Sequence, residues 1–192
     1  MRELIIVDYR PEWPHMFAEE RERLADVFGT RFVAIEHFGS TSVPGLAAKP
    51  CIDIQVQVSV LEQPEDYAPL VAEIGYLPFD SGENDVRIVF YKDDPGRYNL
   101  SIVRAGSWAA LRPILFRDYL RAHSDALAEY AALKRRLADE SDPHLSYSDK
   151  LPTYTLNKTA FVERMVEIAA REAGLPYRPG NQNIVRQPTA RG

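Results

Sequence analysis

The segment HFGSTSVPGLAAKPCIDIQV, residues 37–56, combines residue types that hold phosphate groups. Its Gly-Ser-Thr-Ser turn, residues 39–42, offers backbone N–H groups and hydroxyls that can cradle an anionic phosphate. Asp53 follows on a strand-like run, and Lys49 adds a positive charge between the turn and the strand. The pattern predicts a phosphate and metal site. The alternative is structural, in which the segment is only a turn and Asp53 caps a helix or pairs with Lys49 or Arg87.

The metal-binding capacity of this segment depends on one carboxylate, that of Asp53. Alternate residues of a strand face the same way, about 6.5–7 Å apart, so two carboxylates there could share two divalent ions. The second position is Gln55, whose amide oxygen is a weak neutral ligand for Mg²⁺. The polar-face positions of a later strand, Asn99 and Ser101, are not acidic either. We therefore expect at most a reduced magnesium centre, with Asp53 as its ligand.

His37 and Ser40 flank the start of the turn. We expect His37 to act as a general base or phosphate ligand beside Ser40, although a core histidine bonded to backbone is the alternative. Ser40 is expected to donate a hydrogen bond rather than to attack as a nucleophile, because the sequence reveals no Ser-His-Asp constellation. The predicted catalytic residues are Asp53, His37 and Lys49.

Basic and aromatic residues farther along the chain complete the predicted site. Three arginines on or beside the later strands would form a local positive funnel, unless they are solvated edge residues. Tyr154 and Lys158 share one helical face and can reach the cleft, as can Tyr130 and Lys134. The predicted substrate- and phosphate-binding residues are Gly39, Ser40, Thr41, Ser42, Gln55, Arg87, Arg97, Asn99, Ser101, Arg104, Tyr154 and Lys158.

The elements that must position these residues alternate between helix and strand in the first half of the chain. Apolar residues recur at helical spacing near the start, and residues 51–60 alternate between apolar and polar side chains. This order predicts a mixed α/β layer. The predicted helices are residues 12–29 and 64–75, and the predicted strands are residues 31–38, 51–60, 86–92 and 99–103, the last two joined as a hairpin.

The second half is predicted to be helical. One long helix is expected from residue 115 to about 137, and a last helix from about 155 to 173. Residues 140–152 are expected to form a polar connector between them. The fold class predicted from the whole pattern is α+β, with a small mixed sheet and a helical C-terminal half.

Composition and charge limit the function classes. At 192 residues, 45% apolar and with a net charge of −5, the chain suits a soluble globular protein better than a strongly basic nucleic-acid-binding one. Cys51 is the single cysteine, and no apolar run has the length of a signal peptide or membrane span, so we expect a cytoplasmic protein without membrane association. The expected division is one domain at 1–174, with a sheet core at about 1–110 and a helical part at about 112–174, then a flexible tail at 175–192.

Five blocks of the sequence resemble the GrpB family, also called UPF0157. The central block, IEHFGSTSVPGLAAKPCIDI, is similar to the family's His-x-Gly-Ser-Thr-Ser/Ala-Val-Pro-Gly-Leu-x-x-Lys-Pro-x-x-Asp at every fixed position. The resemblance extends from about Tyr9 to Ala170. The other blocks that resemble the family are YRPEWPHMFAEE, GRYNLSIVRAGS, LFRDYLRAHSDALAEYAALKRRLA and YTLNKTAFV.

The resemblance implies a nucleotidyltransferase-like fold, with a small mixed sheet flanked by helices. The signature of that superfamily is Gly-Ser, a spacer and acid-x-acid, which Gly39, Ser40 and Asp53 match and Gln55 does not. Ser101 departs from the family, where a histidine is usual. The implied function is that of a metal-assisted nucleotidyltransferase, which uses Mg²⁺ and acts on an unknown small-molecule acceptor.

Three functions remain open on the sequence. In the first, the substrate is a nucleotide or another phosphorylated small molecule, Asp53 holds Mg²⁺, and Lys49 or an arginine neutralises developing charge. In the second, an aminoacyl-tRNA-dependent transferase forms peptide or cyclodipeptide bonds on the same fold, and needs a basic groove for the tRNA. In the third, a non-catalytic module retains the nucleotide pocket. The missing acid favours the second and third, and the retained Gly-Ser-Asp frame favours the first.

Overall fold

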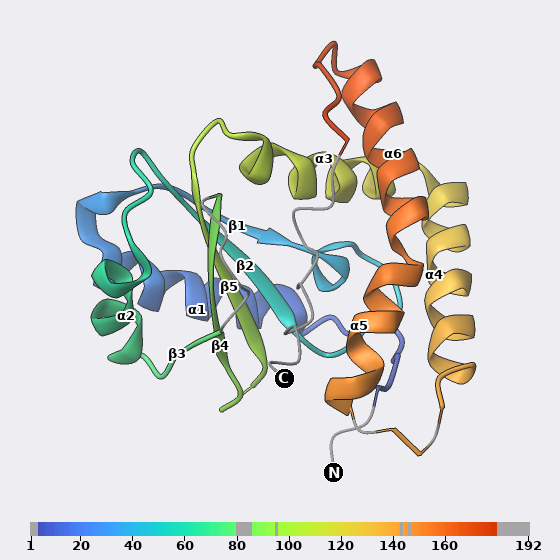
Figure 1. The fold of residues 1–192 in the computed structure, drawn as a ribbon, viewed down its shortest axis with the longest axis horizontal. Coiled ribbons are helices and arrows are strands. Elements are labelled where there is room, and N and C mark those ends of the chain that lie inside the picture. Colours follow the sequence, from blue (N-terminus) through green and yellow to red (C-terminus); the bar gives the residue numbers. More distant parts are fainter. Residues whose placement is uncertain (1–3, 80–85, 95, 143, 146, 180–192) are drawn as a thin grey trace, which may run out of the picture.

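The structure, a computed structural model, has one mixed sheet in the described residues, with strand order β1-β2-β5-β4-β3 (Figure 1). It describes residues 4–79, 86–94, 96–142, 144–145 and 147–179. β2 and β5 run parallel, and the other neighbouring pairs are antiparallel. The predicted α+β class is confirmed, and the short edge strand β3 was not predicted. The strands are β1 Phe32–Phe38, β2 Ile52–Val58, β3 Leu77–Pro78, β4 Arg87–Lys92 and β5 Tyr98–Arg104.

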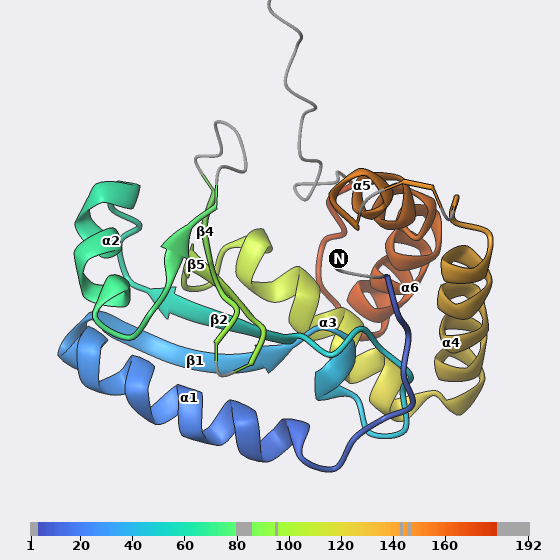
Figure 2. The same ribbon diagram turned by 90° about the horizontal axis from the view of Figure 1, so that it is seen from below.

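The helices cover both faces of the sheet and one of its ends. α1 runs along one face and α3 along the other, while α4, α5 and α6 stand together beside the end of the sheet (Figures 1 and 2). This arrangement sets the helical second half against the strand ends that carry the Gly-Ser turn. The helices are α1 Trp13–Phe28, α2 Pro64–Ala72, α3 Trp108–Ala122, α4 Ser124–Asp139, α5 Tyr147–Asn157 and α6 Thr159–Glu172.

β2 separates an apolar face from a polar one. Ile52, Ile54 and Val56 are buried in the main core together with residues of α1, α2 and β5. The intervening residues, Asp53 among them, face the α3 side, as the alternation predicts. The predicted strand, residues 51–60, is one residue too long at its start and two at its end, because β2 spans Ile52–Val58, and the side chain of Val60 is 70% exposed.

The predicted helix at 115–137 is two helices, α3 and α4. The break is at His123, whose extended backbone (φ −126°, ψ 96°) interrupts the helix while its N–H still bonds to the Tyr119 carbonyl. Apolar residues on both sides of the break, including Leu120 and Tyr130, enter one second core with Phe161 of α6. The apolar spacing therefore continues across the break and cannot reveal it.

The predicted helix at 155–173 is also divided. α5 begins at Tyr147, inside the segment predicted as a polar connector, and ends at Asn157. Lys158 then lies at the junction with α6, where its N–H bonds to the Thr155 carbonyl three residues earlier. The predicted domain division at residue 174 stays a prediction, and residues 180–192 of the predicted tail lie outside the described residues. Within the described part, no helix combines the length and apolarity needed to cross a bilayer.

Candidate functional site

A cavity of about 250 Å³ lies where the Gly-Ser turn and the polar face of the sheet meet the helical half. We call it the lysine cavity. Because polar residues from both halves of the chain line this cavity, we take it as the candidate functional site. The polar residues that line it from the sheet side are Gly39, Ser40, Thr41, Lys49, Asp53 and Asn99. Those that line it from the helical side are Arg112, Tyr130, Lys134, Tyr154, Thr155, Lys158 and Thr159.

Gly39 and Asp53 form the floor of the lysine cavity. Gly39 has a φ of +72°, and a Cβ atom there would lie 2.3 Å from Oδ2 of Asp53, so only glycine allows this approach. The other carboxylate oxygen, Oδ1, accepts a hydrogen bond from Asn99 Nδ2 at 2.9 Å. Burial raises the pKa of Asp53, and the bond from Asn99 and the charge of Lys49 oppose that rise. The result is a fixed carboxylate beside the Gly-Ser turn.

Three lysines reach the lysine cavity from three separate segments. Lys49 comes from the loop before β2, Lys134 from α4, and Lys158 from the junction between α5 and α6. Lys134 is 1% exposed, and its Nζ donates to the carbonyl of Ala47. Burial, reinforced by the charges of neighbouring cations, lowers the pKa of Lys134 to about 6 and that of Lys158 to about 7. An incoming anion would relieve this mutual repulsion.

Two aromatic rings support the lysines. Lys158 Nζ lies 4.2 Å from the ring centroid of Tyr154, and Lys134 Nζ lies 4.7 Å from that of Tyr130. Each pair is one helical turn apart in sequence, which is the spacing that predicted them. Arg112 adds a fourth cation from α3 and was not predicted, because a charged residue in mid-helix usually faces solvent.

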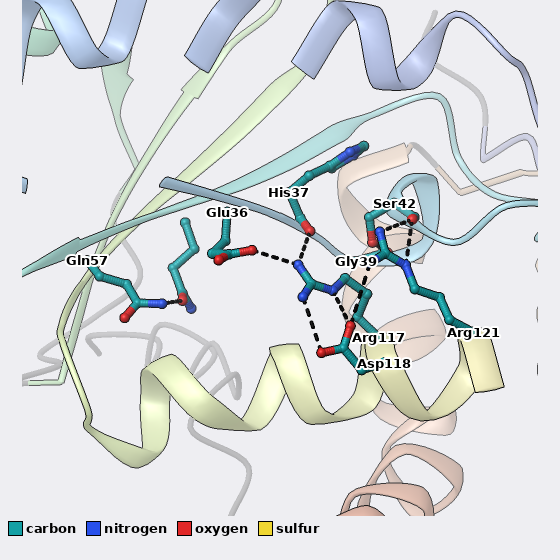
Figure 3. A network of polar contacts seen from close by, with 9 residues as sticks. Glu36, His37, Gly39, Ser42, Gln57, Arg117, Asp118 and Arg121 are labelled. Atoms are coloured by element: carbon teal, nitrogen blue, oxygen red, sulfur yellow. Dashed lines mark hydrogen bonds and ion pairs between the residues drawn. The ribbon is translucent and has the colours of Figure 1, made fainter. Parts of the chain in front are cut away.

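Helix α3 fixes the Gly-Ser turn through two arginines (Figure 3). Arg117 Nη1 donates to Glu36 Oε2 at 2.8 Å and to the main-chain oxygen of His37 at 2.9 Å. Arg121 donates to the carbonyl of Ser42 from Nη2 at 2.7 Å and from Nε at 3.2 Å. These bonds hold the end of β1 and the turn against α3, so the helix positions the cavity without lining it at these residues.

His37 lies on the opposite face of the sheet from Asp53. Its ring stacks on Phe17 of α1, with 4.8 Å between ring centroids, and Figure 3 shows it turned away from α3. Its Nε2 is 3.0 Å from Thr41 Oγ1, which donates to the carbonyl of Cys51 at 3.0 Å. Since that hydroxyl has one proton, the hydrogen bond must be donated by His37 Nε2.

The protonation state of His37 agrees with this placement. Burial first, and then the guanidinium charges of α3, lower the pKa of His37 to about 4, so the ring is neutral at pH 7. The structure therefore does not bring His37 to the lysine cavity as a base for chemistry at Asp53. Its position favours the core-histidine alternative, in which it holds the turn through Thr41.

Three predicted residues line a smaller hollow next to the lysine cavity. These are Gln55, Arg87 and Ser101, and the hollow shares Arg112 and Phe38 with the lysine cavity. Both amide atoms of Gln55 are occupied: Nε2 donates to the Ala109 carbonyl at 3.4 Å, and Oε1 accepts from Gln57 Nε2 at 3.1 Å.

The remaining predicted residues lie elsewhere. The hydroxyl of Ser42 donates to the carbonyl of Gly39 at 2.6 Å and so closes the turn. Arg97 forms an ion pair with Asp93, with 3.7 Å between Nε and Oδ1. Arg104 is at the far end of β5, beside a larger cavity of about 660 Å³ that contains no other predicted site residue.

The donor set of the lysine cavity does not fit a resident magnesium ion. Asp53 is the one carboxylate among the residues that line it, one of its oxygens is bonded to Asn99, and lysines surround it. Across the described ranges, no three or more His, Cys, Asp or Glu residues are grouped so that they could hold a metal. Magnesium therefore stays a prediction that solution experiments must test.

Most of the chain is similar to proteins of one family. A sequence profile described as GrpB protein matches residues 3–167. UPF0157 protein YqkA of Bacillus subtilis is 37% identical over 173 residues, which cover 88% of this chain and 48% of that protein. The glutamate-rich protein GrpB of Alkalihalophilus pseudofirmus is 32% identical over 171 residues, which cover 85% of this chain and 94% of that protein. The chain thus spans about half the length of the first relative and most of the second.

A solved structure shares the fold. The crystal structure of conserved protein GrpB from Enterococcus faecalis superposes with a TM-score of 0.76 at 31% sequence identity. The match covers 88% of this chain and 99% of that one. Both the sheet and the helical half therefore have a counterpart in a solved relative.

Proposed function

The chain belongs to the GrpB family, and for this member we propose that the lysine cavity binds a nucleotide or another phosphorylated small molecule and transfers a nucleotidyl or phosphoryl group from it. The observation that carries the proposal is the convergence of Lys49, Lys134 and Lys158 beside the Gly39 turn. Lys134 is buried and the other two lysines are half-buried, so gathering three ammonium groups around one carboxylate favours an anionic ligand. A phosphate chain is the ligand whose charge and oxygen acceptors match these donors.

The proposed chemistry uses groups within the cavity. The N–H groups of the turn at Ser40 and the ammonium groups of Lys49 and Lys158 hold the phosphate oxygens. Asp53, whose pKa is raised by burial, accepts the proton of the acceptor hydroxyl. The acceptor oxygen forms a bond to phosphorus while the bond between phosphorus and the leaving phosphate oxygen breaks. The lysines neutralise the negative charge that develops on that leaving oxygen.

Ligand binding provides the first test. Titration calorimetry with ATP and with inorganic pyrophosphate should detect binding, and Lys158→Gln should weaken it about 10- to 100-fold, the value of one charge-assisted contact. Lys150→Gln, which removes a lysine of α5 that does not line the cavity, is the matched control and should bind as the natural protein does. Absence of binding by both ligands would contradict the proposal.

Turnover provides the second test. Release of pyrophosphate from nucleoside triphosphates, with a panel of hydroxyl acceptors, should be lost in Asp53→Asn while nucleotide binding remains. Each assay is run with Mg²⁺ and with EDTA, because the single carboxylate predicts binding that survives chelation. Binding without turnover against every acceptor would instead support the non-catalytic module.

A second candidate function is aminoacyl transfer from tRNA. The single-acid floor of the cavity favours it, because transfer from an activated ester needs no pair of metal ions. Filter binding of aminoacylated tRNA distinguishes the two candidates. Saturable binding that depends on the aminoacyl group would support this function, and its absence together with nucleotide turnover would support the first.

A further inference from the structure

Lys158 differs from Lys134 in its contacts, although both line the lysine cavity. Lys134 is 1% exposed and its Nζ donates to the Ala47 carbonyl, whereas Lys158 is half-buried. Across the described residues, no hydrogen-bond acceptor contacts Lys158 Nζ, which lies 4.2 Å from the ring centroid of Tyr154. The nitrogen of Lys158 is therefore open to the cavity, and no acceptor holds it as an ammonium ion.

The surroundings of Lys158 favour its neutral amine. Burial first, and then the charge of Lys49, lower the pKa of Lys158 to about 7, against the opposing charge of Asp53. About half of the Lys158 side chains are therefore neutral at pH 7, whereas less than about one in a thousand ordinary lysines is neutral there. A neutral amine has the lone pair of a nucleophile, and desolvated lysines beside another cation serve as nucleophiles in enzymes.

A neutral amine suits a cavity with one carboxylate. A hydroxyl acceptor must lose a proton when it attacks phosphorus, and many enzymes assist that attack with metal ions. The donors around Asp53 do not fit a resident magnesium ion. An amine attacks phosphorus without losing a proton beforehand. The residues that line the lysine cavity are thus sufficient to begin group transfer.

We propose that Lys158 attacks the phosphorus first and carries the transferred group as a covalent adduct until an acceptor takes it. The inference rests on the proposed function, because it assumes that the lysine cavity binds a nucleotide or another phosphorylated molecule. It concerns the amine form of Lys158, whereas the ammonium form contributes to binding. The donor substrate is then a phosphoanhydride, such as a nucleoside triphosphate, whose leaving group departs before the acceptor reacts.

The two steps balance in atoms and protons. In the first step, the bond from Lys158 Nζ to phosphorus forms, the bond from phosphorus to the leaving oxygen breaks, and Asp53 accepts one proton from the nitrogen. In the second step, Asp53 returns this proton to the nitrogen, the acceptor oxygen bonds to phosphorus, and the bond between nitrogen and phosphorus breaks. The proton of the acceptor hydroxyl then passes through Asp53 to water, and Lys158 is again an amine.

Radiolabelled nucleotides test the inference. The natural protein is incubated without acceptor with ATP, GTP, CTP or UTP labelled at the α- or the γ-phosphorus, and the label that survives denaturation is counted. The covalent step predicts a burst in which each labelled chain releases one leaving group. Label from the α-position indicates nucleotidyl transfer, and label from the γ-position indicates phosphoryl transfer. Peptide mapping should place the label on Lys158, in a bond that is labile to acid and stable to alkali, as a nitrogen–phosphorus bond is.

Two variants separate a nucleophile from a residue that only binds. Lys158→Arg keeps the positive charge but has no amine lone pair, so it should still bind nucleotide in calorimetry and should acquire no label. Lys150→Gln removes a lysine of α5 that does not line the cavity and should be labelled as the natural protein is. The melting temperature of each variant is measured alongside.

The outcomes distinguish this inference from the proposed function. Label that persists in Lys158→Arg, or that maps to another residue of the natural protein, would overturn the inference. Nucleotide binding by a natural protein that acquires no label would also overturn it, and would leave the proposed binding standing. Absence of binding by the nucleotides and by pyrophosphate would overturn the proposed function, and this inference with it.

Discussion

At the scale of single residues, the contact between Gly39 and Asp53 couples the turn to the strand. The same carboxylate touches the space where a Gly39 side chain would stand and accepts a bond from Asn99. Any side chain at position 39 must move the Asp53 carboxylate or distort the turn. The glycine of the motif is therefore required by two features, its positive φ and its close neighbour.

Gly39→Ala should lower both stability and affinity. Strain at a positive φ costs about 1–3 kcal/mol, and displacement of Asp53 should weaken pyrophosphate binding at least about tenfold. Gly106→Ala is the matched control, because Gly106 has the same φ of +72° and nothing within 4 Å of its Cβ position. Urea unfolding and calorimetry measure the two effects. An affinity loss equal in both variants would show that the contact with Asp53 is unimportant.

Residue patterns predicted the site residues that belong to a recognisable local spacing, but not those that only the tertiary fold brings to the cavity. Short-range spacing was enough to select Gly39, Asp53 and Lys158, which the structure brings together. Arg112 was missed, because nothing in its local sequence distinguishes a cavity-facing arginine from a solvated one. His37 was assigned to chemistry by its neighbours in sequence, but strand alternation places it on the face opposite Asp53. Which face of the sheet meets the helical half is a tertiary property.

At the scale of elements, periodicity predicted four of the five strands in the described residues and located the helical segments, but not the breaks within them. Predicted α1, β2, β4 and β5 agree with the structure within a few residues, because each has a clear period. Residues on both sides of the break at His123 pack in one core with α6, and a local period does not contain such packing. The second break matters for the site, because it places Lys158 at a helix junction inside the cavity.

The hydrogen bonds from Arg117 and Arg121 of α3 to the end of β1 and the Gly-Ser turn, here called the α3 clamp, should stabilise the fold. Arg117→Gln should lower the free energy of unfolding by about 2 kcal/mol, since hydrogen bonds of a partly buried charged group are lost. It should also weaken pyrophosphate binding, although Arg117 does not line the cavity. Arg164→Gln removes an exposed ion pair with Glu129 and should cost less than about 1 kcal/mol. Urea unfolding that gave equal losses would contradict the clamp.

At the scale of the whole molecule, the charge inside the lysine cavity has the opposite sign to the net charge of the chain. The chain carries −5 overall, yet three lysines and an arginine surround one carboxylate in the lysine cavity. Net charge argues against a broad basic surface but says nothing about the lysines of the cavity, because a sum over the sequence carries no information on position. A cluster of this kind raises the free energy of the ligand-free state and makes it depend on pH.

Stability should rise with pH between about 6.5 and 8.5. Burial lowers the pKa of Lys134 to about 6 and that of Lys158 to about 7, whereas both keep ordinary values near 10.5 when the chain unfolds. In this range the unfolded chain binds more protons than the folded one, so the free energy of unfolding increases as pH rises. Each lysine contributes at most about 1.4 kcal/mol per pH unit.

Two variants test whether the lysines of the cavity cause this increase of the free energy of unfolding with pH. Lys158→Gln should flatten the increase and raise stability at pH 6.5, because the amide needs no proton in either state. Lys150→Gln should keep the slope of the natural protein, since Lys150 does not line the cavity. The measurement is urea unfolding at constant ionic strength, without phosphate or sulfate in the buffer. A slope that is flat or falling in the natural protein would mean that the lysines stay charged in the folded state, and the cavity would then be more open to water than its burial implies.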